Sequence, residues 1–211
     1  MATRNAQIAK CGNAAERFMC SNADVRTRLG NYFKKPIANI DLIKGRKKSD
    51  NLITFEDGTT CKLQNKDGQG DNRGWSVDRR DVSNMPLDDT GKHLLGVVCL
   101  KRPGERVNVD SHPNLIRDLL LGTDPRYVPD YFTHSIFHKE TGELLSLSIA
   151  PTDKVIDALT TIAYPQLVAK RTCVHISPLM YLQRKGGGKS DSAPDDIQLK
   201  MKSLPDVMEL V

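Results

Sequence analysis

The sequence lacks the features that mark several large classes of protein. Aromatic residues make up 5% of its 211 residues, and a single Trp is present. No apolar run approaches the roughly 18–20 residues that span a membrane. The first residues contain no apolar segment typical of a secretory signal, so we expect an intracellular, cytoplasmic protein. The composition also excludes collagen, a coiled coil and wholesale disorder.

Cysteine is scarce, odd in number and scattered. No Cys-x-x-Cys pair occurs, so neither a structural zinc site nor a disulfide framework is predicted, and a reducing compartment fits best. We interpret each cysteine as an ordinary core or surface residue. The five are Cys11, Cys20, Cys61, Cys99 and Cys173.

Several catalytic and nucleotide-binding motifs are also missing. The sequence contains no GxxxxGK[ST], GxGxxG, GxSxG or HExxH, which argues against P-loop, Rossmann, hydrolase-elbow and zinc-protease sites. His134 and His138 have a helical metal spacing, but their segment looks extended. On a strand they would lie about 13 Å apart, so we do not predict a metal site there.

The net charge and the length of the chain exclude less, and each is compatible with several kinds of protein. Lys and Arg number 31 against 26 Asp and Glu, a net charge of +5. A mildly basic chain permits a nucleic-acid partner without requiring one. The length fits one ordinary domain, and we expect a single domain over residues 1–211.

Hydrophobic periodicity predicts a mixture of helices and strands. Asn22 and Thr152 are the expected N-caps of two helices, and Pro36 ends one. The mixture favours an α/β domain with a mixed sheet. The expected helices are 6–20, 23–33, 113–121 and 153–163, and the expected strands are 37–43, 94–101, 134–138, 172–183 and 196–202, with a hairpin over 49–66.

The hairpin carries the most informative residues. An Asp-Gly turn at 57–58 separates Asp50 from the triplet Gln64-Asn65-Lys66. A three-residue loop over 57–59 would place Asp50 opposite Lys66 and Leu52 opposite Gln64. A two-residue loop would put Gln64 and Lys66 on the other face, so convergence requires the longer turn or a bulge.

This set of side chains suits phosphodiester hydrolysis. A carboxylate with an amide oxygen is a hard-ligand site for Mg²⁺. A neighbouring Lys can orient a water and stabilise developing negative charge. Two other Gln-x-Lys triplets, beginning at Gln183 and Gln198, lack an acid across a hairpin.

Ser49-Asp50, the hairpin and Gln64-x-Lys66, with Gly12-x-x-x-Glu16 in the first helix, form a known pattern. The chain resembles the PD-(D/E)XK nuclease superfamily, and type II restriction endonucleases in particular. The basic run 44–48 and the Gly- and Arg-rich stretch after Lys66 add to the resemblance, which covers residues 8–82. It implies a restriction-endonuclease-like α/β core over about 6–101, a mixed β-sheet flanked by helices.

The resemblance also implies roles for individual residues. Asp50 and Glu16 would bind Mg²⁺, Gln64 would complete that shell and Lys66 would position the attacking water. Gln64 stands where the family usually has a carboxylate, which leaves Glu16, Glu56 or Asp67 as the second acid. We prefer Glu16, on the edge of its helix stripe. Glu56 would lie roughly 20 Å away at the far end of the hairpin, and Asp67 would point to the opposite face.

Two basic segments are candidates for DNA contacts. Arginine matches guanine edges and phosphates. In the first segment, ion pairs with Asp78 or Asp81 are the alternative, and in the second a solvated loop. The candidates are Arg73, Trp75, Arg79 and Arg80 in the first, and Arg184, Lys185 and Lys189 within a C-terminal segment of about 172–203 that serves DNA contact or an interface.

The resemblance implies a Mg²⁺-dependent, sequence-specific double-stranded DNA endonuclease from a microbial or viral host cell. A palindromic target would imply a two-fold homodimer, and a monomer is the alternative. Two other functions stay open. One is a DNA-binding module on a nuclease-like scaffold that has lost catalysis, and the other is a structure-selective repair or resolvase nuclease.

Overall fold

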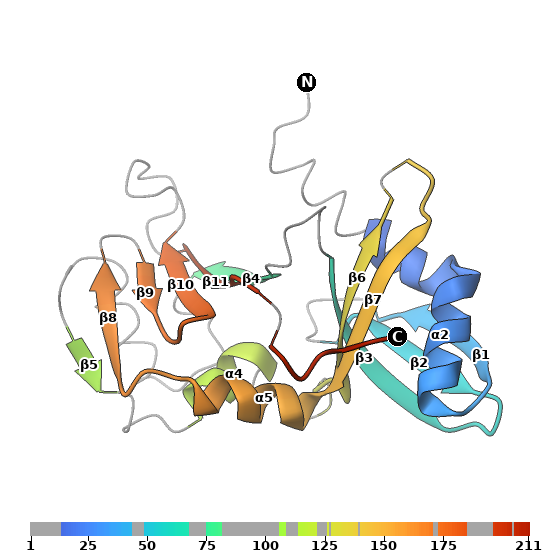
Figure 1. Cartoon of the computed structure of the whole chain (residues 1–211), viewed down its shortest axis with the longest axis horizontal. Coiled ribbons are helices and arrows are strands. Elements are labelled where there is room, and N and C mark those ends of the chain that lie inside the picture. The colour runs from blue at the N-terminus through green and yellow to red at the C-terminus, as the bar shows by residue number, and fades with distance from the viewer. Residues whose placement is uncertain are drawn as a thin grey trace. The chain divides into compact units, whose positions relative to one another are not determined.

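The computed structural model groups the chain into two compact units. The first comprises Met1–Arg73, Tyr127–Val155 and Val207–Val211, and the second Gly74–Arg126 and Ile156–Asp206. Each unit contains a six-stranded sheet (Figure 1). In the described part of the chain, no helix is long and apolar enough to cross a membrane. The structure describes residues 14–43, 49–67, 75–81, 106–108, 114–121, 126, 128–138, 140–170, 173–184, 196–203 and 205–211.

The first sheet is mixed, which confirms the predicted α/β class. Its order is β1-β2-β3-β6-β7-β12, in which β3 and β6 run parallel and the other neighbours antiparallel. Helices flank it. Its strands are β1 (Ile37–Leu42), β2 (Asn51–Phe55), β3 (Thr60–Asp67), β6 (Tyr131–Phe137), β7 (Leu144–Pro151) and β12 (Glu209–Leu210).

Two helical segments precede the sheet. Residues 14–21 are helical, and the predicted residues 6–13 lie outside the described residues. Helix α2 (Ala23–Phe33) has the predicted bounds and N-cap, because the Asn22 side chain accepts hydrogen bonds from the backbone N–H groups of Asp24 and Val25. Lys34, in the left-handed conformation, closes α2 just before Pro36.

The core of the first unit lies between these helices and one face of the sheet. Alternate residues of β2 are buried there, as expected for a strand with one covered face. The core cluster includes Met19, Val25, Leu29, Ile53 and Leu63, all with no exposed surface. Cys61 belongs to this core too. Its burial, with a smaller contribution from the negative charge of Asp130, raises the pKa of its thiol to about 12. Cys20, Cys61 and Cys173 are free thiols.

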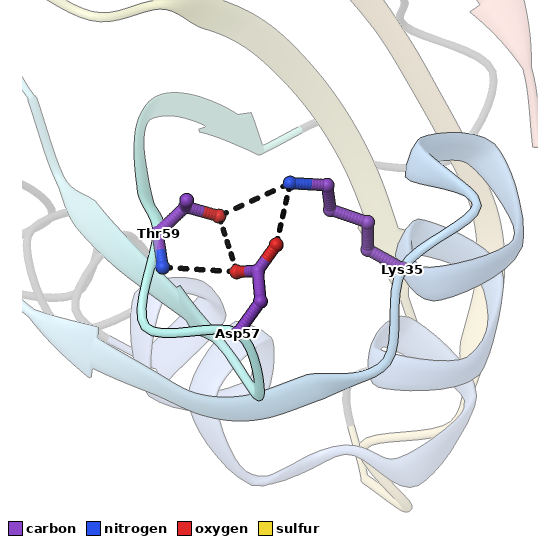
Figure 2. A network of polar contacts seen from close by, with 3 residues as sticks. All are labelled: Lys35, Asp57 and Thr59. Carbon is purple, nitrogen blue, oxygen red and sulfur yellow. Dashed lines mark hydrogen bonds and ion pairs between the residues drawn. The ribbon is translucent and has the colours of Figure 1, made fainter.

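The β2–β3 hairpin closes through a three-residue turn over 56–58. The N–H of Phe55 donates to Thr59 (2.9 Å), and the N–H of Gly58 donates to Phe55 (2.9 Å). Gly58 has φ +81°, the left-handed conformation that such a loop requires at this position. Asp57 accepts bonds from the backbone and hydroxyl of Thr59, and Lys35 donates to Asp57 at 2.7 Å (Figure 2). These bonds hold the pKa of Asp57 well below its usual range.

The turn has the expected length but begins one residue earlier than predicted. The register is therefore shifted by two residues, and Leu52 lies opposite Lys62 and not opposite Gln64. The predicted register was wrong because Gly58 is the last residue of the loop and not its central one. The left-handed conformation is required at that last position. A two-residue shift preserves the alternation of faces, so Gln64 and Lys66 stay on the face expected for convergence.

The second sheet is antiparallel, in the order β4-β11-β10-β9-β8-β5. Residues 75–81, which no predicted helix or strand covered, form one of its strands. Residues 94–101 lie outside the described part. The strands are β4 (Trp75–Asp81), β5 (Arg106–Asn108), β8 (Gln166–Lys170), β9 (Cys173–His175), β10 (Met180–Arg184) and β11 (Asp196–Met201), and α4 (Leu115–Leu121) also belongs to this unit.

The predicted strand over 172–183 is in fact a hairpin of two strands, β9 and β10. The buried Ser177 hydroxyl accepts bonds from the N–H groups of Leu179 and Met180, at 3.2 and 2.9 Å. This serine turn, followed by Pro178, interrupts the strand.

Helix α5 (Thr152–Thr161) is present where expected, but its predicted N-cap is wrong. Thr152 is itself the first helical residue, and its buried hydroxyl has no hydrogen-bond partner among the described residues.

Candidate functional site

Asp50 and Lys66 form an ion pair at the open end of the β2–β3 hairpin. The Asp50 Oδ2 and Lys66 Nζ atoms are 3.7 Å apart, and the side chains are only 18% and 14% exposed. The N–H of Asp50 donates to the carbonyl of Leu63 (2.8 Å), while Asn51 is the register partner of Leu63. Two consecutive residues therefore oppose one, as in a β-bulge, a feature that redirects side chains.

Gln64 lies two residues before Lys66 and hence on the same face of β3. It is 3% exposed, and its Oε1 atom has no hydrogen-bond partner in the part of the chain that the structure describes. Its register partner in β6 is Phe132, which pairs in turn with Ala150 of β7. An amide oxygen buried without a partner typically costs about 1–3 kcal/mol, so this atom marks a position where a ligand would be favourable.

Glu16 reaches the same region from helix 14–21. Burial raises the pKa of Glu16, the nearby charge of Asp50 raises it further, and the charge of Lys66 lowers it. Glu16 is therefore within electrostatic reach of both members of the ion pair. The Asn51 amide connects this helix to β2, because its Nδ2 donates to the Glu16 carbonyl (3.5 Å) and to Cys20 Sγ (3.3 Å).

The structure thus places Glu16 within electrostatic reach of the Asp50–Lys66 pair, and Gln64 lies on the same face of β3 as Lys66. Of the two alternative acids, Glu56 is exposed in the turn at the other end of the hairpin, and Asp67 ends β3 with its side chain outside the description. Two carboxylates and an unpartnered amide oxygen are the donors that a hard cation such as Mg²⁺ prefers. Within the described ranges, no three His, Cys, Asp or Glu side chains gather as a metal site, so a cation here would need the amide.

Two further polar residues follow Lys66 across the sheet, His134 in the adjacent strand and Ser148 in the next one, and neither was predicted as part of this site. Lys66 pairs in parallel register with His134, which pairs with Ser148 in β7. Both are buried, at 1% and 6% exposure. For His134 the sequence offered only its spacing to His138 and an expected strand over 134–138, and neither of these predicts Lys66 as a neighbour. His138 lies beyond the end of β6, exposed, with its Nδ1 near the Thr141 hydroxyl (3.0 Å).

The residues predicted to contact DNA fall in the second unit where the structure describes them. β11 lies between β4 and β10, so both predicted segments contribute to one sheet. Arg80 pairs with Ile197, which pairs with Arg184. Arg79 pairs with Gln198, and Trp75 begins β4. The side chains of Trp75, Arg79, Arg80 and Arg184 lie outside the description, as do Arg73, Lys185 and Lys189 entirely.

Comparisons with known proteins found no match in sequence and a weak likeness in structure. No family model matches the chain, and no curated protein matches it. It is similar to a crystal structure of the restriction endonuclease MspI in complex with its cognate DNA. The TM-score is 0.43 at 14% identity, covering 88% of this chain and 81% of the MspI chain. This likeness is weak, so the case for function depends on the chain's own residues.

Proposed function

We propose that this protein is a Mg²⁺-dependent endonuclease of the restriction type, with a restriction-endonuclease-like core, that hydrolyses phosphodiester bonds in double-stranded DNA. The observation that carries the proposal is the partly buried Asp50–Lys66 pair, with the unpartnered Gln64 oxygen on the same face of β3 as Lys66. A cation and an oriented water are what this hydrolysis requires. Both have candidate residues here.

Asp50, Glu16 and Gln64 are the residues that would hold Mg²⁺. When bound, the ion would neutralise charge on the scissile phosphate. Its positive charge would also lower the pKa of Glu16, opposing the effect of burial and of Asp50. Lys66 would donate a hydrogen bond to the attacking water and stabilise the negative charge that develops at phosphorus.

The second unit would supply DNA contacts through Trp75, Arg79, Arg80, Arg184, Lys185 and Lys189, and Arg73, at the end of a segment of the first unit, would add a further contact. Two copies would act as a homodimer on a palindromic target, since the symmetry of the site then matches that of the protein. The replacement of the usual carboxylate by Gln64 favours one other function, a DNA-binding module that has lost catalysis.

The test is incubation of the purified protein with a long duplex DNA of known sequence, in Mg²⁺ or in EDTA. We expect discrete fragments in Mg²⁺ alone, and sequencing of their ends gives the recognition site. A smear would indicate a nonspecific or structure-selective nuclease. Binding without cleavage would indicate the inactive module.

Matched variants connect any cleavage to the site. Asp50→Ala and Lys66→Ala should each abolish cleavage, and Lys66→Ala should leave specific binding largely intact. Lys62→Ala, two residues before Gln64 on the same strand, and Asp41→Ala on exposed β1 are the controls. Full cleavage by both site variants would remove these residues from the mechanism.

A further inference from the structure

The two faces of the second sheet differ in chemistry along β9, β10 and β11. One face is apolar and buried, with Val174, Met180, Leu182, Leu199 and Met201 all at 3% exposure or less. Residues that alternate with these are partly exposed, as expected for the opposite face. They include His175, Tyr181 and Lys200, which are in register across the three strands.

Aromatic rings organise the cations on this polar face. The rings of His175 and Tyr181 are stacked, with centroids 5.6 Å apart and an interplanar angle of 25°. Lys202 Nζ lies 6.0 Å from the Tyr181 centroid, within the range of a cation–π contact. Lys200 is the register partner of Tyr181. A stacked pair of rings restricts the motion of its neighbours, which reduces the entropy lost when a ligand binds them.

The charge on this face is uncompensated within the described part of the second unit. No carboxylate there pairs with Lys200 or Lys202. The Tyr181 ring is already engaged by His175 and Lys202, so the face offers ammonium groups and not a bare ring for a base to stack on. Two lysines separated by one residue match a polyanion, which can satisfy both, better than a single small anion.

We propose that Lys200 and Lys202, supported by Tyr181 and His175, bind the phosphodiester backbone of DNA. This proposal rests on the proposed function and adds to it a surface in the second unit that positions the duplex. Contacts to phosphates fix orientation and carry no sequence information, so these residues should affect affinity for every sequence equally.

The experiment measures binding of a short fluorescent duplex to the full chain by anisotropy, in EDTA and over a series of salt concentrations. Lys200→Ala and Lys202→Ala should each weaken binding roughly three- to tenfold and reduce the slope of log affinity against log salt by about 0.9. The control is Lys154→Ala, which removes the same charge from an exposed position on α5. Circular dichroism checks that each variant folds.

Two variants of Tyr181 test whether its ring supports the binding by Lys202, or whether the charge of the lysine alone accounts for the affinity. Tyr181→Phe keeps the ring and should bind within about twofold of the wild type, whereas Tyr181→Leu should lose affinity while keeping most of the salt slope. If the Lys200 and Lys202 variants match Lys154→Ala in affinity and in the slope of log affinity against log salt, the proposed DNA-binding surface is overturned. If Lys66-dependent cleavage persisted in that case, the proposed function would stand without it. A wild-type chain that neither binds nor cleaves DNA would overturn both.

Discussion

The first sheet buries polar side chains on both of its faces, whereas the described strands of the second sheet keep one face apolar and expose polar groups on the other. On the helix-covered face of the first sheet, Asn65 Oδ1 accepts bonds from Thr133 (3.1 Å) and Ser135 (3.0 Å). On the opposite face, Gln64 Oε1 finds no described partner. Buried polar groups are nearly always satisfied, so the exception deserves an explanation in terms of a ligand.

In the proposed nuclease, this difference would separate two tasks. Chemistry benefits from partly buried charges whose positions are fixed and whose access to solvent is limited, as at Asp50 and Lys66. Holding a long polyanion requires accessible cations spread over a surface, as at Lys200 and Lys202.

The strongest test compares alanine variants of two lysines, one of which should lose cleavage and the other DNA affinity. Lys66→Ala should lower single-turnover cleavage by about 100-fold or more while changing DNA affinity by less than about twofold, because a residue acting at the transition state adds little to ground-state binding. Lys202→Ala should weaken affinity and leave the cleavage rate of saturated complexes nearly unchanged. If both variants lose binding and cleavage in parallel, the two units do not divide the tasks as we describe.

Packing in the first unit can be disturbed without touching the site. Gly142 has φ +70°, and an added Cβ would lie 2.8 Å from the Phe18 ring, which packs on Phe137 at 5.3 Å between centroids. Gly142→Ala should lower the free energy of unfolding by about 3 kcal/mol, through backbone strain and crowding together. Urea denaturation measures it.

Gly58→Ala is the matched control, since Gly58 also has positive φ but nothing lies within 4 Å of its added Cβ. Strain alone should cost about 1 kcal/mol there. Equal losses in the two variants would contradict the role of the Phe18 contact.

Buried polar groups in the two units can be compared directly. Asn65→Ala leaves two hydroxyls without their acceptor and opens a cavity, and it should cost about 2–3 kcal/mol. Ser177→Ala in the second unit removes a small acceptor from the N–H groups of two turn residues, and about 1 kcal/mol should be lost. Urea denaturation of each variant gives both values, and a larger loss for Ser177→Ala would reverse the comparison.

The smallest expected effect concerns Glu16. Its pKa is raised above 4.5 in the folded protein, so the unfolded chain releases this proton first and stability falls as pH rises from about 4.5 through the folded value. Glu16→Gln should therefore stabilise the metal-free protein at neutral pH by about 0.5 kcal/mol, allowing for solvent screening. Below pH 4.5 the advantage should disappear.

Thermal unfolding over a pH series, with and without Mg²⁺, measures this. Added Mg²⁺ should stabilise the wild type more than Glu16→Gln if Glu16 holds the ion. Glu140→Gln, at an exposed turn position, is the control. An identical response of both variants to Mg²⁺ would place the ion away from Glu16.

Local patterns determined much of the fold and the residues of the candidate site. Asn22 and the apolar stripe after it fixed helix α2, and the Asp57-Gly58 turn fixed the hairpin that joins Asp50 to Gln64 and Lys66. Even in this hairpin, the observed strand register differs from the predicted one by two residues, because the loop places Gly58, its left-handed residue, at its end. These features are encoded within about a dozen residues, where propensity and periodicity act.

Only the tertiary structure decided which distant segments meet. The parallel pairing of β3 with β6 places His134 beside Lys66, some 68 residues away in sequence. The antiparallel pairing of β11 (Asp196–Met201) with β4 (Trp75–Asp81) likewise joins segments that are far apart in the sequence. No local signal specifies such pairings, because they are chosen by the total burial of apolar surface against the entropy of closing long loops. The sequence thus named the candidate side chains, and long-range packing decided their neighbours.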